Sequence, residues 1–393
     1  MNDFREPDIN KLSRNQSKKI LFVISEDWYF ISHRFFLAKY AISKGFEVFL
    51  LTKVTTHKNL IETSGIQLIN WPISRRSANI FQEIKTLLIY SKAIKQSNPE
   101  IIHAVGLKPI LYGALLAKAY KIKIRISAFA GLGYVFSSTQ YLAKFLRPLM
   151  IFMMKTLLKN KYSTIIMQNN DDSELFIKNN IVRKSQIKII KGVGVDTELF
   201  FGLKNSNKTP IVLLPARLLK DKGIEDFVEI AKNLKNDGIN ARFVISGRED
   251  PSNPEAVDNA SLKEWKQSNL IEIWGHVDDM AKAYQKASLV CLPSFREGLP
   301  KALLEAASSE KAIVTYDVPG CREVVINNVN GFLVDFRDID QFSKAIKTLL
   351  LNDNLRKEMG KAGREFVLKN FSQEEIARQT LSLWLAKLDT TQS

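Results

Sequence analysis

The chain contains few residues of the types that form structural metal sites or disulfides. Its 393 residues include two cysteines and four histidines. Cys291 lies within an apolar stretch, Cys321 stands apart from it, and the histidines lack the spacing of a ligand set. The sequence therefore predicts a reduced compartment without a disulfide framework, chemistry that is independent of a metal, and no resident cofactor.

The chain also lacks a long apolar run. No stretch reaches the roughly 18 uninterrupted apolar residues that a membrane span requires, and the longest candidate, 148–154, ends at Lys155. Residues 1–17 are polar and contain no apolar signal region, so we expect a flexible leader there. A hydrophobic content of 45% with 25% charged residues is typical of a globular protein. We expect a globular intracellular protein that does not cross a membrane.

Acidic residues are missing from one long stretch. Between Ile101 and Asn170 there is none, while ten Lys and Arg residues occur there. Residues 1–204 carry 31 basic and 14 acidic residues, a net charge of +17, whereas 205–393 carry 26 and 27, a net charge of −1. This asymmetry predicts a positive face on the first half of the chain, of the kind that attracts anionic lipid or nucleic acid.

Segment 141–162 combines that charge with apolar side chains. Long aliphatic and aromatic residues alternate there with basic ones, namely Lys144, Arg147, Lys155 and Lys159. The pattern favours a helix in a membrane interface, kinked near Pro148, over a nucleic-acid groove. A core helix whose lysines extend into solvent would produce the same pattern.

Short apolar strands alternate with helices along most of the chain. This alternation predicts parallel sheets joined by right-handed crossovers. A segment rich in Lys, Asn and Ser, 202–209, interrupts the alternation and is the best linker. We therefore expect an α/β fold of two Rossmann-like domains, 18–204 and 205–370, that face each other across a cleft. Within 371–393 we expect a C-terminal helix that packs back on the first domain, then a short tail.

The most informative segment of the chain is 295–305. An apolar strand ends just before it, and the turn Gly298-Leu299-Pro300 opens a helix in which the missing N–H of proline is no loss. Glu297 precedes the turn, and Glu305 lies about a turn and a half into the helix, with its side chain leaning back. Backbone amides and the positive helix end meet at such a start, which predicts a ligand with phosphate and hydroxyl groups.

A second strand leads into a turn at residues 211–223. This turn carries Arg217 and Lys222. Arginine offers a planar fork of donors and lysine a compact charge, and the two together are typical of a diphosphate site.

Together the two segments resemble the donor site of the GT-B glycosyltransferases, more narrowly the large retaining family (family 4 type) that contains bacterial glycan-assembly enzymes. The family's Glu-x7-Glu signature is Glu297 to Glu305, and its Arg-x4-Lys signature is Arg217 to Lys222. The resemblance implies that Arg217 and Lys222 neutralise the leaving nucleoside diphosphate. It implies that Glu305 binds the ribose hydroxyls, while Glu297 and the amides of Gly298, Leu299 and Pro300 address the transferred sugar.

Two more strand ends are candidates for the same donor site. Gly247 follows a strand and is placed either to approach the diphosphate or to form an ordinary strand-end turn. By resemblance, Val277 with its neighbours would offer backbone groups to the nucleobase. An acidic pair follows Val277 at residues 278–279, and another lies at 171–172. We expect both pairs to be helix caps and first-turn residues rather than metal ligands.

Four further segments, 27–34, 106–109, 131–136 and 318–323, resemble a subgroup that extends polyprenyl-diphosphate-linked glycans. This resemblance implies a set of acceptor-side residues, namely Ser32, His33, Arg34, His103, Lys108, Gly131 and Gly133.

One position departs from the family pattern. Many members have two histidines separated by one residue at the end of the strand near 101–102, and here His103 is followed by Val105. We therefore expect His103 to be a strand-end histidine bonded to backbone, and Lys108, at a helix start, to contact an acceptor phosphate.

The resemblance implies a retaining hexosyl- or N-acetylhexosaminyltransferase. It would use a nucleoside-diphosphate sugar, in particular a UDP-sugar, and an undecaprenyl-diphosphate saccharide in surface-polysaccharide or glycoprotein-glycan assembly. The protein would lie on an anionic surface, the cytoplasmic face of the inner membrane, and bind no nucleic acid. Three alternatives remain: transfer to a soluble acceptor, a GT-B epimerase or phosphorylase, and a polyanion-binding protein without activity. The last would not account for the carboxylate pair.

Overall fold

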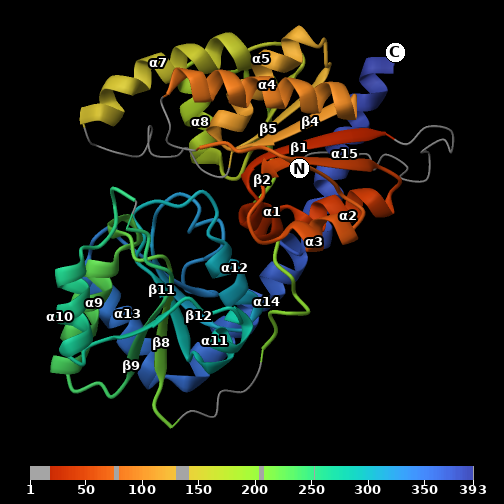
Figure 1. Ribbon diagram of the computed structural model, residues 1–393. Helices are drawn as coiled ribbons and strands as arrows, with labels where there is room; N and C mark the ends of the chain where they lie inside the picture. The colour runs from red at the N-terminus through yellow and green to blue at the C-terminus, as the bar shows by residue number, and fades with distance from the viewer. Residues whose placement is uncertain (1–17, 75–78, 130–140, 203–207, 252, 393) are drawn as a thin grey trace. The chain divides into compact units, whose positions relative to one another are not determined.

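The computed structural model describes residues 18–74, 79–129, 141–202, 208–251 and 253–392, and the chain forms two compact units (Figure 1). The first unit comprises residues 1–193 and 373–393, and the second comprises 194–372. The sequence pattern placed the divisions at 204 and 370 instead. The difference arises because segment 195–202 packs within the second unit, where Val195 donates to the carbonyl of Phe371 at 2.9 Å and Phe200 is buried.

The first unit is built on a sheet of seven parallel strands in the order β3-β2-β1-β4-β5-β6-β7. Its strands are β1 Lys19–Glu26, β2 Glu47–Lys53, β3 Gln67–Asn70, β4 Ile101–Val105, β5 Ile124–Ala128, β6 Ser163–Met167 and β7 Ile187–Ile189. Its helices are α1 Asp27–His33, α2 Phe35–Ser43, α3 Lys58–Thr63, α4 Ile80–Ser97, α5 Leu107–Ala119, α7 Tyr141–Leu158, α8 Asn170–Lys178, the short η2 Lys184–Gln186 and α15 Gln373–Gln392.

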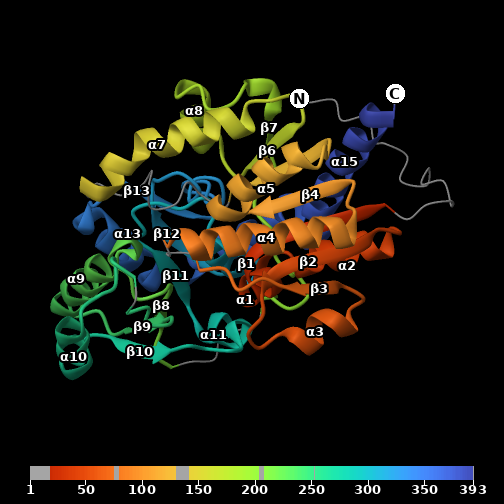
Figure 2. The same cartoon turned by 45° about the horizontal axis from the view of Figure 1, so that its top comes forward.

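Helices cover both faces of this sheet because its strands are apolar on both faces, as parallel strands usually are. Ile20, Phe22 and Ile24 of β1 pack with α2 and α15, whereas Leu21 and Val23 pack with α4, α5, α7 and α8. On the second face α5 contacts both α4 and α7, and Figure 2 shows the three helices side by side.

The C-terminal helix α15 belongs to the first unit. Its Trp384 is fully buried, with ring centroids 5.8 Å from Phe22 and 5.9 Å from Phe46. Two aromatic contacts from one side chain anchor the end of the chain under the first sheet.

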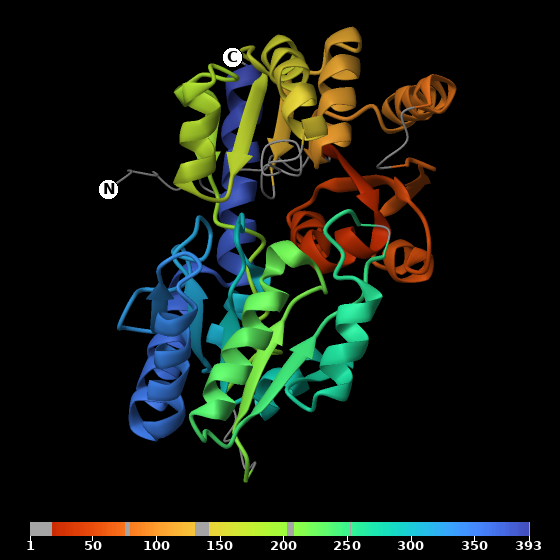
Figure 3. The same ribbon diagram turned by 90° about the vertical axis from the view of Figure 1, so that its left-hand side faces the viewer.

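The second unit contains a sheet of six parallel strands in the order β10-β9-β8-β11-β12-β13 (Figure 3). Its strands are β8 Ile211–Pro215, β9 Arg242–Ser246, β10 Glu272–Gly275, β11 Leu289–Leu292, β12 Ala312–Tyr316 and β13 Gly331–Val334. Its helices are η3 Lys220–Lys222, α9 Ile224–Asn236, α10 Asn259–Gln267, α11 Met280–Lys286, α12 Lys301–Ser308, α13 Ile339–Leu351 and α14 Asp353–Asn370.

The sequence pattern also predicts a first strand at 19–24, then a polar loop and a helix from about residue 35. The loop prediction is wrong, because α1 begins at Asp27, directly after β1. The predicted acidic caps are confirmed: Asp279 accepts from the amide of Lys282 at 3.1 Å, and residues 171–172 lie in the first turn of α8. Among the described helices, none is long and apolar enough to span a membrane.

Candidate functional site

Two loops of the second unit meet where the neighbouring strands β8 and β11 end. Phe295 donates its backbone N–H to the carbonyl of Asp221 at 2.9 Å, and the Ser294 hydroxyl donates to the same carbonyl at 3.2 Å. These bonds hold the turn before α9 against the turn before α12. As a result, two predicted residues from distant parts of the sequence are in contact, with Lys222 Nζ 2.7 Å from Glu297 Oε1.

Two glycines make this approach of backbones possible. Gly223 has φ +69°, and a Cβ on it would lie 1.8 Å from the carbonyl oxygen of Pro293. Gly320 has φ +84°, and a Cβ there would lie 2.6 Å from the carbonyl oxygens of Glu297 and Gly298. Any other residue at these positions would force the turns apart and also strain the backbone.

The Lys222 ammonium is mostly buried and remains charged. Burial by itself lowers the pKa of Lys222, but the Glu297 carboxylate outweighs burial and holds the pKa above its ordinary value. The pairing therefore keeps Lys222 positively charged just before α9, beside the Glu297 carboxylate, which accepts hydrogen bonds.

Glu305 is 9% exposed and lies within α12. One carboxylate oxygen, Oε2, accepts from the Tyr284 hydroxyl at 3.1 Å, and the other, Oε1, lies 3.3 Å from Lys301 Nζ. Burial raises the pKa of Glu305, while Lys301 and the hydrogen bonds oppose the increase. The two partners hold the carboxylate in one orientation inside the site.

Arg217 lies in the same turn as Lys222 but is exposed. Its Nη1 lies 3.2 Å from the carboxylate of Asp250, which follows β9. Sequence reasoning did not identify Asp250. The signal available for it was its place after a strand end, in the Gly247-Arg248-Glu249-Asp250 segment.

The remaining predicted donor residues lie at the ends of β9 and β10 and before α12. Gly247 donates its N–H to the carbonyl of Gly275 at 2.9 Å, and Val277 packs at the edge of the core. Gly298 and Leu299 lead to Pro300, the N-cap of α12, which makes no side-chain capping bond.

Both cysteines are buried, and burial raises the pKa of the Cys321 thiol to about 12.

The acceptor-side residues of α1 lie close to one another. The His33 ring stacks on Tyr29 with centroids 4.1 Å apart, and its Nδ1 lies 3.2 Å from the carbonyl oxygen of Tyr29. Ser32 is exposed, whereas Arg34 is 6% exposed and donates from Nη1 to the carbonyl of His33 at 3.0 Å.

The prediction that His103 bonds to backbone is wrong. The ring is 1% exposed between Phe22 and Trp384, and neither ring nitrogen has a hydrogen-bond partner in the structure. The ring packs instead against the side chains of Phe22 and Trp384, which carry no hydrogen-bond acceptor. Burial lowers the pKa of His103 well below its ordinary value, and Arg34 adds to the shift, so the ring is neutral.

Lys108 is held by a partner that the sequence did not reveal. Its Nζ lies 2.7 Å from the carboxylate of Glu83 on α4 and donates to the carbonyl of Ser74 at 2.9 Å. The Tyr112 hydroxyl donates to the other oxygen of Glu83. Gly131 and Gly133 lie outside the described residues.

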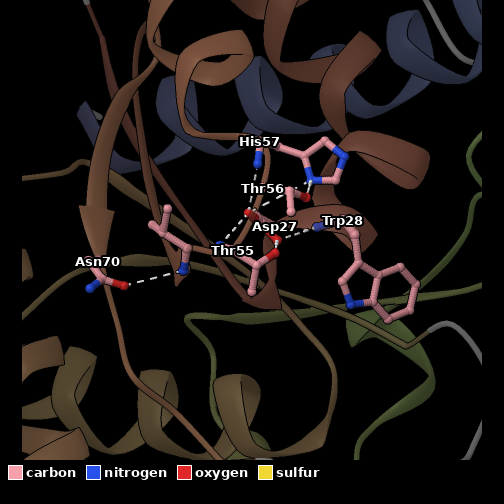
Figure 4. Close-up of polar contacts among 7 residues, drawn as sticks. Asp27, Trp28, Thr55, Thr56, His57 and Asn70 are labelled. Atoms are coloured by element: carbon pink, nitrogen blue, oxygen red, sulfur yellow. Dashed lines mark hydrogen bonds and ion pairs between the residues drawn. The ribbon is translucent and has the colours of Figure 1, made fainter.

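A buried carboxylate organises the first loop of the first unit (Figure 4). Asp27 accepts from the backbone amides of Trp28 at 2.8 Å and Thr55 at 2.7 Å, and from that of His57 at 3.2 Å. The Thr55 hydroxyl donates to it as well. Burial raises the pKa of Asp27, but these hydrogen bonds outweigh it and the net shift is downward. Sequence reasoning quoted Asp27 only within a segment and missed this role.

Metal ligands are absent from the described part of the chain. No group of three or more His, Cys, Asp or Glu side chains in it is placed to hold an ion.

Comparisons with known proteins place both units in one group of enzymes. Residues 19–169 match a family described as glycosyl transferase 4-like, and residues 195–366 match glycosyl transferases group 1. The chain is 30% identical over 351 residues to the Campylobacter jejuni N,N'-diacetylbacillosaminyl-diphospho-undecaprenol alpha-1,3-N-acetylgalactosaminyltransferase, covering 86% of this chain and 90% of that protein. It is 24% identical over 316 residues to the Escherichia coli UDP-Gal:alpha-D-GlcNAc-diphosphoundecaprenol alpha-1,3-galactosyltransferase, covering 77% and 79%.

Solved structures share the fold. Sucrose-phosphate synthase from Thermosynechococcus elongatus superposes with a TM-score of 0.79 at 19% identity, covering 95% of this chain and all of that one (100%). HepE from Anabaena, crystallised with UDP and glucose, gives a TM-score of 0.75 at 16% identity, covering 94% and 100%. The predicted fold class, two Rossmann-like units of the GT-B type, is confirmed.

Proposed function

This chain belongs to the group 1 glycosyltransferases with a 4-like N-terminal half, and from that premise we propose that it transfers a sugar from a UDP-sugar to a polyprenyl-diphosphate-linked saccharide. The observation that carries the proposal is the contact of Lys222 with Glu297 at the start of α12, with Glu305 farther along the same helix. Two relatives named for diphospho-undecaprenol acceptors support the acceptor class, and one of them is named for UDP-galactose.

The donor diphosphate would bind where the positive charges converge. Lys222, Arg217 and the start of α12 come from two turns that hydrogen bonds hold together. As the bond from the anomeric carbon to the diphosphate breaks, negative charge develops on the leaving oxygen. Fixed cations and oriented amides stabilise this charge without reorganising, which lowers the barrier.

The two carboxylates would have different tasks. Glu305 is oriented by Tyr284 and Lys301, so it is placed to accept hydrogen bonds from the ribose hydroxyls. Glu297 precedes the Gly298-Leu299-Pro300 turn and would address the transferred sugar. Retention follows if the acceptor hydroxyl attacks on the face from which the diphosphate leaves, with the leaving diphosphate oxygen taking the hydroxyl proton.

The direct test is an assay of the purified full chain with undecaprenyl-diphosphate saccharides and a panel of nucleotide sugars. We expect UDP release that depends on the acceptor, a product with the donor's anomeric configuration, and activity that persists with a chelator. Conversion of the donor without any acceptor would indicate an epimerase instead. Polyanion binding with no UDP release would contradict an enzymatic role.

Glu305→Ala should raise the donor KM more than it lowers turnover. A carboxylate that binds ribose contributes equally in the ground and transition states, so its loss weakens binding uniformly. Loss of one hydrogen-bonding charged group predicts an increase in KM of roughly 10- to 100-fold. Tyr284→Phe, which leaves the carboxylate but removes the hydroxyl at 3.1 Å, is the matched variant and should give a smaller increase in KM. A Glu305→Ala enzyme that loses turnover at unchanged KM would refute the ribose role.

We further propose that the first unit lies on an anionic membrane surface, on the cytoplasmic face if the donor is cytosolic. The helices α4, α5 and α7 lie side by side, and large apolar side chains are exposed on all three. These residues, here called the apolar face, are Ile80, Phe81, Ile84, Leu88, Leu115, Phe145, Leu149 and Phe152. Helix α7 also packs Met154 and Leu158 into the core, so it is a core helix on one side and exposed on the other.

Liposome binding tests this surface. Replacing Phe145, Leu149 and Phe152 by serine should raise the dissociation constant for anionic liposomes at least about tenfold, because each side chain loses its apolar burial in the interface. High salt should release the native protein only partly, since salt screens the basic residues and not the apolar contact.

The control is a triple serine variant of Ile326, Leu351 and Leu368, which are also exposed but belong to the second unit. It should bind liposomes like the native protein. Equal binding by all three proteins would show that the apolar face does not contact lipid.

A further inference from the structure

A small cavity in the first unit is lined in part by Arg34 and His103, whose side chains carry nitrogen atoms that no described protein atom satisfies. It lies between the start of α2, the middle of β4, the end of β6, the segment after β7 and the first turns of α15. Its volume is about 20 Å³, measured as the space that the centre of a water-sized sphere occupies. That space holds one water molecule or one ion of similar size.

Arg34 brings a positive charge to this cavity without a counter-charge. Its guanidinium is buried, its Nη1 donates to the carbonyl of His33, and its Nε has no partner. In the described part of the chain no carboxylate lies within 4.0 Å of this side chain. A guanidinium does not lose its proton in a protein, so the charge persists and its burial is costly unless it is paired.

A second buried arginine of the same unit shows the contrast. Arg125 is 8% exposed, and it donates from Nε to the carbonyl of Ile122 at 2.8 Å and from Nη2 to that of Ala117 at 3.0 Å. Its guanidinium also lies 5.4 Å from the Tyr162 ring centroid. The fold thus satisfies Arg125 with its own groups and leaves Arg34 Nε to the cavity.

His103 adds a second donor. The neutral ring carries one N–H, and both ring nitrogens lack partners. The Thr380 hydroxyl, also at the cavity, is committed to the carbonyl of Ile376 at 2.8 Å. The helix α15 begins at Gln373, so its positive end adjoins the same space, and the nearby Glu375 carboxylate is paired with Arg378 at 3.0 Å. Water would satisfy the N–H groups but would leave the charge of Arg34 uncompensated.

We propose that this cavity is an anion site of halide size, with Arg34 Nε–H and a His103 N–H as donors. Its ligand is a compact anion, either a free chloride ion or one oxygen of a phosphoryl group. The second source rests on the proposed function, because it would belong to the lipid-linked acceptor. The strand ends beside the cavity are where ligands of parallel α/β sheets bind.

Thermal unfolding of the full chain tests the site without any transferase assay. The probe is sodium chloride against sodium gluconate at constant ionic strength, because gluconate is too large for the cavity. The melting temperature should rise by roughly 3 °C for each tenfold excess of chloride over its Kd. Arg34→Met should abolish this dependence, while Arg125→Met, although destabilised, should keep it.

Equal melting temperatures of the native protein in the two salts would overturn the proposal, and so would loss of the chloride effect in Arg125→Met. Crystals grown with bromide give a second readout, which does not require the variants to fold. An anomalous peak between Arg34 Nε and the His103 ring supports the site, whereas a water molecule without anomalous signal there overturns it.

Inhibition kinetics distinguish the two sources once the site is established. If chloride competes with the lipid-linked acceptor at constant ionic strength, the cavity binds a phosphoryl oxygen of the acceptor during the reaction. If chloride does not compete, the cavity holds a resident chloride ion. An inactive protein that still shows the chloride shift would count against the proposed function and leave the anion site supported.

Discussion

Lys222→Ala and Arg217→Ala should each lower turnover by about 10²–10³-fold, the loss that follows removal of one group stabilising transition-state charge. The reason is that both cations act mainly on charge that develops as the diphosphate leaves. Donor affinity, measured by calorimetry with UDP-sugar, should fall less than turnover does. For Lys222 the effect includes a second cost, because the alanine variant leaves the Glu297 carboxylate without the partner it has at 2.7 Å.

Lys220→Ala is the matched control for this experiment. Lys220 lies in the same short helix η3 and is exposed. Its replacement by alanine removes the same charge from the same turn. Its turnover should stay within about threefold of the native enzyme, because exposed charges interact weakly through water. If the Lys220 variant is as impaired as the Lys222 variant, the effect is one of net charge and the assignment fails. Near-normal turnover in both Arg217→Ala and Lys222→Ala would also defeat it.

Gly223→Ala should lower the free energy of unfolding of the second unit by about 3–5 kcal/mol, in the range of the largest single-residue effects. A Cβ at this position would lie 1.8 Å from the carbonyl oxygen of Pro293, so the turn carrying Lys222 must move away from the turn carrying Glu297. Donor affinity should fall in parallel, because the same displacement separates the groups that would hold the diphosphate. Chemical denaturation and UDP binding are the measurements.

Gly238→Ala separates this steric effect from backbone strain. Gly223 and Gly238 flank the helix α9, and their φ angles are +69° and +74°. No atom lies within 4 Å of a Cβ at Gly238, so its alanine variant has only the cost of the left-handed conformation, about 1–2 kcal/mol. Equal destabilisation by the two variants would show that the contact with Pro293 contributes nothing, and that the two turns do not depend on this approach.

Local pattern was enough to predict the frame of the fold. Strand periods act over a few residues, so β8 and β11 were recognisable from apolar runs and turn residues alone. The donor motif was recognisable for the same reason, since Glu297, the Gly298-Leu299-Pro300 turn and Glu305 lie within one strand–turn–helix unit. The sequence left two interpretations of segment 141–162 open, a helix in a membrane interface and a core helix. Both kinds of helix have the same sequence pattern, because apolar residues look the same in sequence whether they face the core or the outside.

Partners from distant segments could not be predicted in this way. Asp27 is a charged residue at a strand end by sequence, and only the folded chain brings Thr55 and His57 to its carboxylate. The fold also brings Glu83 of α4 to Lys108, a pairing that the sequence did not reveal, while the contact of Lys108 with an acceptor phosphate stays a prediction. In both cases the pairing of the group depends on atoms supplied by segments far away in the chain.

The sequence by itself determined the two-domain α/β class and the family signature, because each depends on neighbours within one supersecondary unit. Only the tertiary structure decided that His103 has no hydrogen-bond partner among the described residues and that Arg34 is buried with no described carboxylate beside it. The physical reason is burial. The free energy of a polar group depends on which atoms exclude water from it and which of them accept or donate hydrogen bonds, and no local pattern contains that information.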